Sequence, residues 1–343
     1  MLRTAIVGLG KMGLSHYAIL NTHPGVQVDA VCDTAGYLLS VVAKYTGVRP
    51  FSDFRKMLKT LRLDAVVIAT PTSTHYQLVR SALDHGLHVF CEKPLSLSPK
   101  ESEELVTLAE ARKLVAQVGY HNRFVATFRE LKRLLVARAI GDITHVLAEA
   151  YGPVILHPST TTWRSRRSEG GGCLLDYAAH PINLLTWYLG TPVAAGGTAL
   201  KSVFSSDTDD AVAATLLFHG GESAQLCVNW SDESSRKMTT RITIWGTAGR
   251  LFADRQECQA FLRSRATAPA GYRDGWNVRF ITDLTDQVWF YLRGEEYSAQ
   301  IDYFVRRIEG RQEDENINSF ASAFATDRAI SMIIEDASRR PHG

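Results

Sequence analysis

Residues 3–13, RTAIVGLGKMG, decide the fold. A short apolar run leads directly into the pattern G-x-G-x-x-G, and a helical segment follows. The glycine pattern is weak by itself, but a strand before it and a helix after it make it informative. Gly8 permits a tight turn, Gly10 lets the backbone approach a pyrophosphate, and Gly13 lets the helix pack on the strand. The free N–H groups of the helix N-terminus attract phosphates. We therefore predict a dinucleotide site that comprises Gly8, Gly10, Lys11, Met12 and Gly13.

An acidic residue follows the next apolar run. Asp33 comes directly after residues 26–32, VQVDAVC, and stands twenty positions past Gly13. A carboxylate at this place binds the ribose hydroxyls of an adenosine, whereas it repels a 2′-phosphate. No Arg or Lys follows it in CDTAGY. The sequence therefore favours NAD over NADP as the cofactor.

The first third of the chain alternates between strand and helix patterns, which predicts an α/β fold. Such alternation is typical of βαβ units, and right-handed crossovers then favour a doubly wound parallel sheet of the Rossmann type. The predicted strands are residues 3–8, 26–32, 64–70, 88–91 and 115–120. The predicted helices are residues 11–22, 34–46, 53–60, 74–85 and 98–114.

The pattern changes after residue 121. The later extended segments alternate apolar and polar residues, as in TRITIW, which is typical of a mixed or antiparallel sheet with one solvated face. We expect strands at residues 143–151, 211–218, 224–231, 240–245 and 278–284. We expect helices at residues 124–139, 174–189, 296–309 and 320–338. The predicted organisation is a dinucleotide-binding domain, residues 1–121, and an α+β domain for substrate binding and oligomerisation, residues 122–343.

Composition excludes several classes of protein. A net charge of +2 without a basic block gives no electrostatic case for nucleic acid. Five scattered cysteines without a C-x-x-C pair argue against a disulfide framework or a zinc finger. We find no apolar run of about 18 residues, so no membrane span is expected, and the first residues do not resemble a signal peptide. The expected location is cytoplasmic.

Two further strand ends carry candidate site residues. Ligands of such sheets bind outside the carboxyl ends of the strands. ATPTSTH, residues 69–75, therefore places Thr70 and Pro71 near the dinucleotide. His75 either packs locally in the next helix or lies near the cofactor.

The run HVFC ends in Glu92-Lys93-Pro94. We expect Lys93 to lie near the nicotinamide, where desolvation and the cationic ring lower the pKa of its amine into a range useful for proton transfer. Glu92 is expected at the same cofactor crevice. The structural alternative is a plain ion pair between Glu92 and Lys93.

GGGCLLDYAAHPINLLTWYLG, residues 170–190, is the richest stretch of the second half. Asp176, His180 and Asn183 fall at helical spacing and share one face. Pro181 kinks this helix or lies in its first turns. Two other interpretations are a metal pair and a set of capping and packing residues. No further ligand cluster lies nearby in the sequence, so we predict no metal site.

In combination, G-x-G-x-x-G, ATP…H and EKP, followed by a β-rich domain, resemble the Gfo/Idh/MocA family of glucose–fructose oxidoreductase and inositol dehydrogenase. The resemblance implies that His180 is the acid/base for the reacting hydroxyl beside Lys93, and that Asp176 orients it or binds a neighbouring hydroxyl. Many relatives carry Asp where Asn183 stands. The implied cofactor contacts also include Arg123 in GYHNRF, and Trp163 and Arg164 in TWR. The implied substrate contacts are Lys93, Arg123, Asp176, His180 and Asn183.

These features predict an NAD-dependent oxidoreductase. It would transfer hydride between nicotinamide and a secondary hydroxyl or keto group of a sugar, a polyol or a nucleotide-linked sugar. One alternative is a redox-neutral epimerase or glycosidase that retains its NAD, and another is a non-catalytic dinucleotide-sensing regulator. By analogy with relatives, we expect a homodimer or homotetramer.

Overall fold

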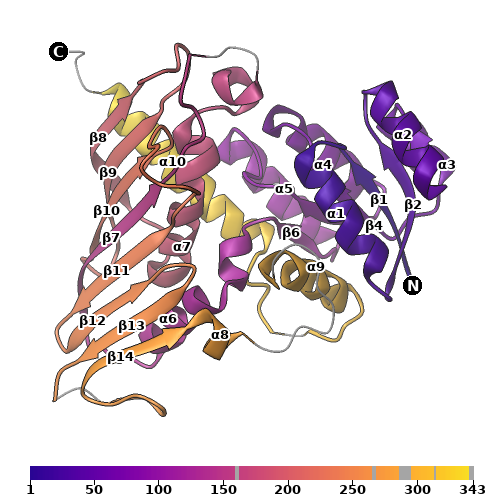
Figure 1. Cartoon of the computed structure of the whole chain (residues 1–343). Helices are drawn as coiled ribbons and strands as arrows, with labels where there is room; N and C mark the ends of the chain where they lie inside the picture. Colours follow the sequence, from indigo (N-terminus) through magenta and orange to yellow (C-terminus); the bar gives the residue numbers. More distant parts are fainter. Residues whose placement is uncertain (159–161, 265–267, 286–294, 313, 340–343) are drawn as a thin grey trace. The chain divides into compact units, whose positions relative to one another are not determined.

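The computed structural model describes residues 1–158, 162–264, 268–285, 295–312 and 314–339 (Figure 1). The chain divides into two units, each with its own sheet. The first unit contains Met1–His121 and Gln287–Phe324, and the second contains Asn122–Asp286 and Ala325–Gly343. A late segment of the chain therefore belongs to the first unit and not to the second.

The first unit is built on a six-stranded parallel sheet. Its strand order is β3-β2-β1-β4-β5-β6, the doubly wound order that the glycine pattern predicts. The strands are β1 (Leu2–Val7), β2 (Val26–Cys32), β3 (Arg49–Phe51), β4 (Ala65–Ile68), β5 (His88–Cys91) and β6 (Ala116–Val118). The predicted α/β fold class is confirmed. The short strand β3 was not predicted, since its three residues include Pro50 and form no apolar run.

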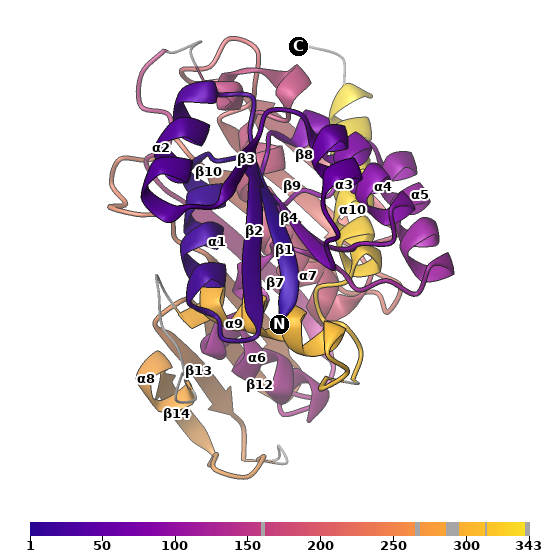
Figure 2. The ribbon, with the colours of Figure 1, turned by 90° about the vertical axis from the view of Figure 1, so that its right-hand side faces the viewer.

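Helices cover both faces of this sheet, as a sheet buried on both faces requires. They are α1 (Lys11–Thr22), α2 (Gly36–Thr46), α3 (Phe54–Thr60), α4 (His75–Asp84), α5 (Pro99–Ala111) and the short η1 (Thr72–Thr74). In Figure 2, α1 lies on one side of the strands, and α4 and α5 lie on the other. One core cluster joins α1 to the strands through Ile19, Leu20, Ile6 and Phe90.

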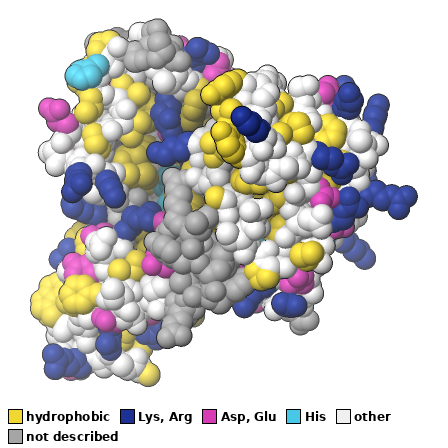
Figure 3. All heavy atoms as spheres, turned by 45° about the vertical axis from the view of Figure 1, so that its right-hand side comes forward, with side chains coloured by type: hydrophobic (Ala, Val, Ile, Leu, Met, Phe, Trp, Pro, Cys, Tyr) yellow, Lys and Arg dark blue, Asp and Glu magenta, His cyan; other side chains and the backbone are white. Residues whose placement is uncertain are grey.

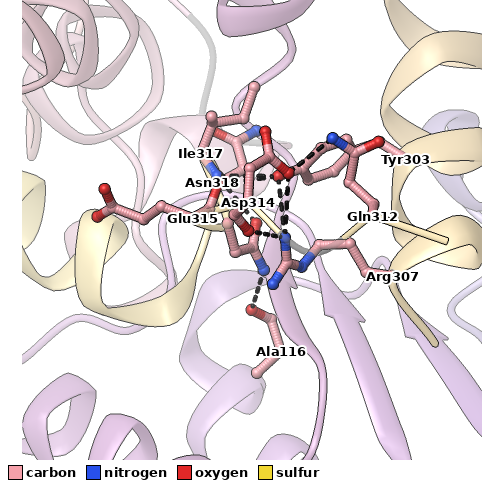
Figure 4. Close-up of polar contacts among 9 residues, drawn as sticks. Ala116, Tyr303, Arg307, Gln312, Asp314, Glu315, Ile317 and Asn318 are labelled. Atoms are coloured by element: carbon pink, nitrogen blue, oxygen red, sulfur yellow. Dashed lines mark hydrogen bonds and ion pairs between the residues drawn. The ribbon is translucent and has the colours of Figure 1, made fainter. Parts of the chain in front are cut away.

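A late segment of the chain completes this unit. Helix α9 (Glu295–Ile308) packs Ile301, Phe304 and Val305 into the same cluster. The segment that follows α9 then pairs with β6, where the Val118 N–H donates to Asn318 O at 2.9 Å. Figure 4 shows how Tyr303 and Arg307 of α9 hold this segment through the backbone of residues 314–317. The sheet edge at β6 is therefore covered by chain from the far end of the sequence.

The second unit carries an eight-stranded mixed sheet, as predicted. Its order is β14-β13-β12-β11-β7-β10-β9-β8, and only β7 and β10 pair in parallel. The strands are β7 (Ile143–Tyr151), β8 (Ala194–Lys201), β9 (Ala211–Leu217), β10 (Ser223–Asn229), β11 (Arg241–Gly246), β12 (Gly249–Ala253), β13 (Glu257–Leu262) and β14 (Gly275–Phe280). Sequence patterning missed β8, β12 and β13. It also extended the last strand to residue 284, whereas α8 (Ile281–Leu284) ends it at Phe280.

Helices cover one face of this sheet and leave the other open. They are α6 (Ala126–Val136), α7 (Ala179–Leu189), α10 (Phe320–Ser338), the short η2 (His121–Phe124), η3 (Trp163–Ser165) and η4 (Arg167–Glu169), and one π-helical turn, η5 (Leu174–Ala178). In β7 the buried side chains alternate with partly exposed ones, which is the pattern of a half-buried strand. None of the helices in the described ranges combines the length and the apolar character that a membrane span needs.

The open face of the second sheet is apolar at one edge. On the edge strand β14, Trp276, Val278 and Phe280 alternate along one face and are 51%, 43% and 53% exposed. Figure 3 shows hydrophobic side chains at the lower left, in the part of this unit that carries β12 to β14. Large exposed apolar side chains in a row are typical of an interaction surface.

Candidate functional site

The glycine loop has the geometry that a dinucleotide requires. Gly8 takes a φ of +91°, and a Cβ there would lie 2.6 Å from the carbonyl oxygen of Ala69. A Cβ on Gly13 would overlap the carbonyl oxygen of Gly8, so both positions require glycine. Gly10, in contrast, has no atom within 4 Å of its Cβ position. The loop is thus closed against its own sheet and open at the N-terminus of α1, where phosphates bind.

Asp33 borders this loop. Its two carboxylate oxygens accept hydrogen bonds from the backbone N–H groups of Leu9, at 2.6 Å, and Ala35, at 2.7 Å. These bonds tie the end of β2 to the glycine loop after β1. The carboxylate therefore lies beside the loop that receives the pyrophosphate, which is the place of the ribose in such folds. Together, the open Gly10 and the adjacent acid fit an NAD molecule.

The end of β4 lies next to the glycine loop, because β4 pairs with β1. Thr70 is half-buried and Pro71 is exposed there. His75 is buried, and its ring nitrogens lie 2.8 Å from Pro94 O and 2.9 Å from Thr70 O. Burial lowers the pKa of the His75 ring, which these two carbonyl groups and Glu92 partly oppose. His75 thus joins the ends of β4 and β5.

Glu92, Lys93 and Pro94 follow β5 at the same sheet edge. Glu92 is buried and continues the strand pairing, since its N–H donates to Ile68 O. Its carboxylate oxygen Oε1 lies 2.7 Å from Nε2 of His16 on α1. Lys93 is half-buried, and its peptide bond to Pro94 is cis. The sequence had indicated the turn itself but gave no role to His16.

Glu92 is ionised in this setting. Burial alone would raise the pKa of its carboxyl group, but the hydrogen bond and charge of His16, and then the charge of Lys93, lower it below the ordinary value. Gly119 of the neighbouring strand end leaves room for the carboxylate, because a Cβ there would stand 3.0 Å from it. The turn therefore places a fixed negative charge directly before Lys93.

In the second unit, the helix that carries the predicted acid/base begins irregularly. Asp176 lies in the π-helical turn η5 and His180 in the first turn of α7, and both are buried. Pro181 also lies in that first turn, directly after the π-helical turn η5. π-turns occur frequently at functional sites.

Asp176 is paired with an arginine. Nε of Arg164 donates to Asp176 Oδ2 at 2.8 Å, and the guanidinium stands 4.7 Å from the centre of the Trp163 ring. The TWR segment and the D-x-x-x-H segment, which the sequence singled out separately, are therefore in direct contact. The ion pair orients the Asp176 carboxylate.

Arg123 and Asn183 form a second buried pair. Arg123 is 2% exposed, and it donates from Nε to Asn183 Oδ1 at 2.7 Å and from Nη2 to Asn183 O at 2.9 Å. The amide of Asn183 in turn donates to Thr326 of α10 at 3.0 Å. These contacts hold α7 in the second unit. The sequence missed Thr326, because nothing in its pattern marks it.

Asn122 presents a different environment. It is 2% exposed, and neither atom of its side-chain amide has a hydrogen-bond partner in the described part of the chain. Nearly all buried polar groups have a hydrogen-bond partner, so a bound ligand would explain why this amide lacks one. Among the described residues, no group of three or more His, Cys, Asp or Glu side chains could hold a metal ion.

Comparison with known families agrees with this geometry. Residues 2–120 match a family model described as an oxidoreductase family with an NAD-binding Rossmann fold. Residues 128–252 match the GFO/IDH/MocA C-terminal domain. The chain is therefore an NAD-dependent oxidoreductase, and the predicted cofactor is confirmed. It belongs to the Gfo/Idh/MocA family.

Several relatives are dehydrogenases. The scyllo-inositol 2-dehydrogenase (NAD(+)) of Bacillus subtilis (strain 168) is 29% identical over 259 residues, which cover 73% of each protein. The D-glucoside 3-dehydrogenase of Escherichia coli (strain K12) is 28% identical over 204 residues, which cover 59% of this chain and 56% of that protein.

Solved structures share the fold. Levoglucosan dehydrogenase in complex with NADH and L-sorbose has a TM-score of 0.84 at 21% identity, with 98% of this chain and 97% of that chain covered. The WlbA dehydrogenase from Bordetella pertussis, in complex with NADH and UDP-GlcNAcA, has a TM-score of 0.80 at 21% identity and the same coverage. At these identities the likeness supports the architecture of both units.

Proposed function

We propose that this enzyme oxidises a secondary hydroxyl group of a sugar, a polyol or a nucleotide-linked sugar, or reduces the matching keto group. The observation that carries the proposal is the Glu92–Lys93–Pro94 turn. It stands at the same sheet edge as the open glycine loop, and it holds a half-buried amine after a buried, ionised carboxylate. The relatives named above supply the substrate class.

Lys93 and His180 handle the proton of the reacting hydroxyl. In the oxidation, the O–H proton passes to one of these residues while the other holds the oxygen by a hydrogen bond. The carbon gives its hydrogen up as hydride. Bound NAD supplies the hydride acceptor. General acid–base groups of this kind contribute about 10²–10⁴-fold to a rate.

The remaining predicted residues bind or orient. Gly8, Gly10, Lys11, Met12 and Gly13 receive the pyrophosphate, Asp33 binds the adenosine ribose, and Thr70 and Pro71 line the cofactor crevice. Asp176 orients the substrate or His180, with Arg164 and Trp163 beside it. Arg123 donates to the side chain and the carbonyl of Asn183, and Asn183 donates to Thr326 of α10, so these two residues orient α7.

The decisive experiment is a substrate panel. Inositols, free hexoses, glycosides and nucleotide sugars are each incubated with enzyme and NAD, and reduced nicotinamide is followed by absorbance. We expect one class to yield NADH in equal amount to the ketone formed. Conversion of a sugar without net NADH, by protein that purifies with bound cofactor, would support the redox-neutral alternative instead. Binding of NAD without turnover of any substrate would support the regulator.

We also propose that the protein is a homodimer or homotetramer. The row of Trp276, Val278 and Phe280 on the open sheet face supports pairing between copies. Sedimentation equilibrium tests this, and a monomer at micromolar concentration would contradict it. The cytoplasmic location stays a prediction, which fractionation of cells tests.

A further inference from the structure

Glu92 and Pro94, on either side of Lys93, each contact a buried histidine. His16 on α1 holds the side chain of Glu92 at 2.7 Å, and His75 on α4 holds the carbonyl of Pro94 at 2.8 Å. Both histidines are at most 1% exposed. Because Lys93 stands between two held residues, its backbone position depends on these contacts. We propose that His16 is a positioning residue for Lys93, acting through Glu92.

The bonding of His16 supports this role. The Glu92 carboxylate is ionised and can only accept, so Nε2–H of His16 is the donor. The other ring nitrogen, Nδ1, is buried and has no partner in the described part of the chain. A buried polar atom without a partner costs stability whichever protonation state the ring takes.

A purely structural account of this pair is weak. Replacement of a buried ionic or polar pair by apolar side chains of similar volume is often neutral or stabilising. An apolar residue at position 16 would also pack well, because the ring of His16 lies edge-on against Phe90, with centroids 5.1 Å apart. A histidine at position 16 therefore costs stability. The need to hold the Glu92 carboxylate in place explains why it is there. His16 fixes Glu92, whose Oε2 accepts from the Lys93 N–H at 3.3 Å.

The inference rests on the proposed role of Lys93, so the test needs two independent measurements. The variants are His16→Leu, which removes the donor, and His16→Gln, which restores an N–H near the position of Nε2. The matched control is His23→Leu. His23 follows α1 at its other end, and it also pairs with a carboxylate, Asp302, at 3.2 Å.

The first measurement is the kinetic effect. His16→Leu should lower kcat by about 10²-fold, the loss expected when a reacting group is misplaced by an ångström, while KM for NAD changes little. His16→Gln should recover most of the rate, and His23→Leu should leave kcat unchanged. In a Lys93→Ala background, His16→Leu should cause no further loss. A full additional loss there would overturn the proposal, because His16 would then act independently of Lys93.

The second measurement does not depend on turnover. Lys93 is labelled with an amine-reactive reagent and quantified by peptide mass spectrometry, with the exposed Lys100 of the same protein as the internal reference. Lys93 should react faster in His16→Leu and in Glu92→Gln, but not in His16→Gln or His23→Leu. An unchanged labelling rate in His16→Leu would overturn the proposal. Full activity of Lys93→Ala would overturn the role of Lys93 alone, and labelling would still report whether His16 orders the turn.

Discussion

The two units hold their predicted site residues in different ways. In the first unit, these residues follow the carboxyl ends of β1, β2, β4 and β5, where the sheet topology brings them to one edge. In the second unit, four of the predicted residues bond in pairs, Arg164 with Asp176 and Arg123 with Asn183. The difference teaches that a strand end predicts where a residue lies, whereas helical spacing does not predict what a residue contacts.

The largest expected effect is at Lys93. Lys93→Ala should lower kcat by about 10²–10⁴-fold, because it removes a group that we propose handles the proton. The affinity for NAD should be largely kept, since the glycine loop and Asp33 are intact. Steady-state kinetics and NAD titration check this. Lys100→Ala, an exposed lysine of the same unit, is the control. Turnover near that of the wild type would remove Lys93 from the reaction.

Arg123 tests the second unit, where the predicted residues are hydrogen-bonded in pairs. Arg123→Ala should lower the free energy of unfolding by about 3 kcal/mol, because charged hydrogen bonds and buried packing are lost. Chemical denaturation measures the loss, with Arg129→Ala, an exposed arginine of the following helix α6, as control. If stability is unchanged but NAD binding is lost, Arg123 is instead a direct cofactor contact, as the family resemblance implies.

Asp33 should show a smaller effect on cofactor choice. Asp33→Ala should lower the affinity for NAD by about 10–100-fold, which is the contribution of one or two hydrogen bonds to a charged group. The preference for NAD over NADP should become smaller, because the carboxylate no longer repels a 2′-phosphate. Titration with both cofactors checks this. An unchanged preference would place the ribose elsewhere.

The smallest effect concerns Glu92 and pH. The pKa of its carboxyl group is lowered in the folded protein, although burial opposes this. The resulting stability is present above the ordinary pKa of about 4.3 and is lost as the pH falls through the lower folded value. The difference in Tm between wild type and Glu92→Gln should therefore shrink as the pH falls below about 5. A difference that grows on acidification would contradict the ionised state.

Much of the first unit could be predicted from the sequence. G-x-G-x-x-G, Asp33 and the Glu92–Lys93 turn each mark a strand end, and the rule for doubly wound sheets then brings them together. His16 was missed, although a histidine on the buried face of the helix after the glycine loop is a signal that such reasoning can use. Its partner Glu92 lies 76 residues further on, so spacing could not reveal the pair.

Less of the second unit could be predicted. The strands β8, β12 and β13 are short or rich in small residues, so their alternation is faint. The pairing of Arg123 with Asn183 joins residues 60 apart, and that of Asn183 with Thr326 joins residues 143 apart. Long-range hydrogen bonds of this kind depend on the packing of α7 and leave no local pattern.

The central proposal is that Lys93 and His180 both handle the proton of the reacting hydroxyl. A double-mutant cycle on the rate of hydride transfer in a single turnover tests it most directly, with Lys93→Ala, His180→Ala and the double variant. Residues that act as a unit are strongly non-additive. We predict that the double variant is about as slow as the slower single variant. If the loss of rate in the double variant equals the product of the two single losses, the two residues act independently, which would contradict the proposal.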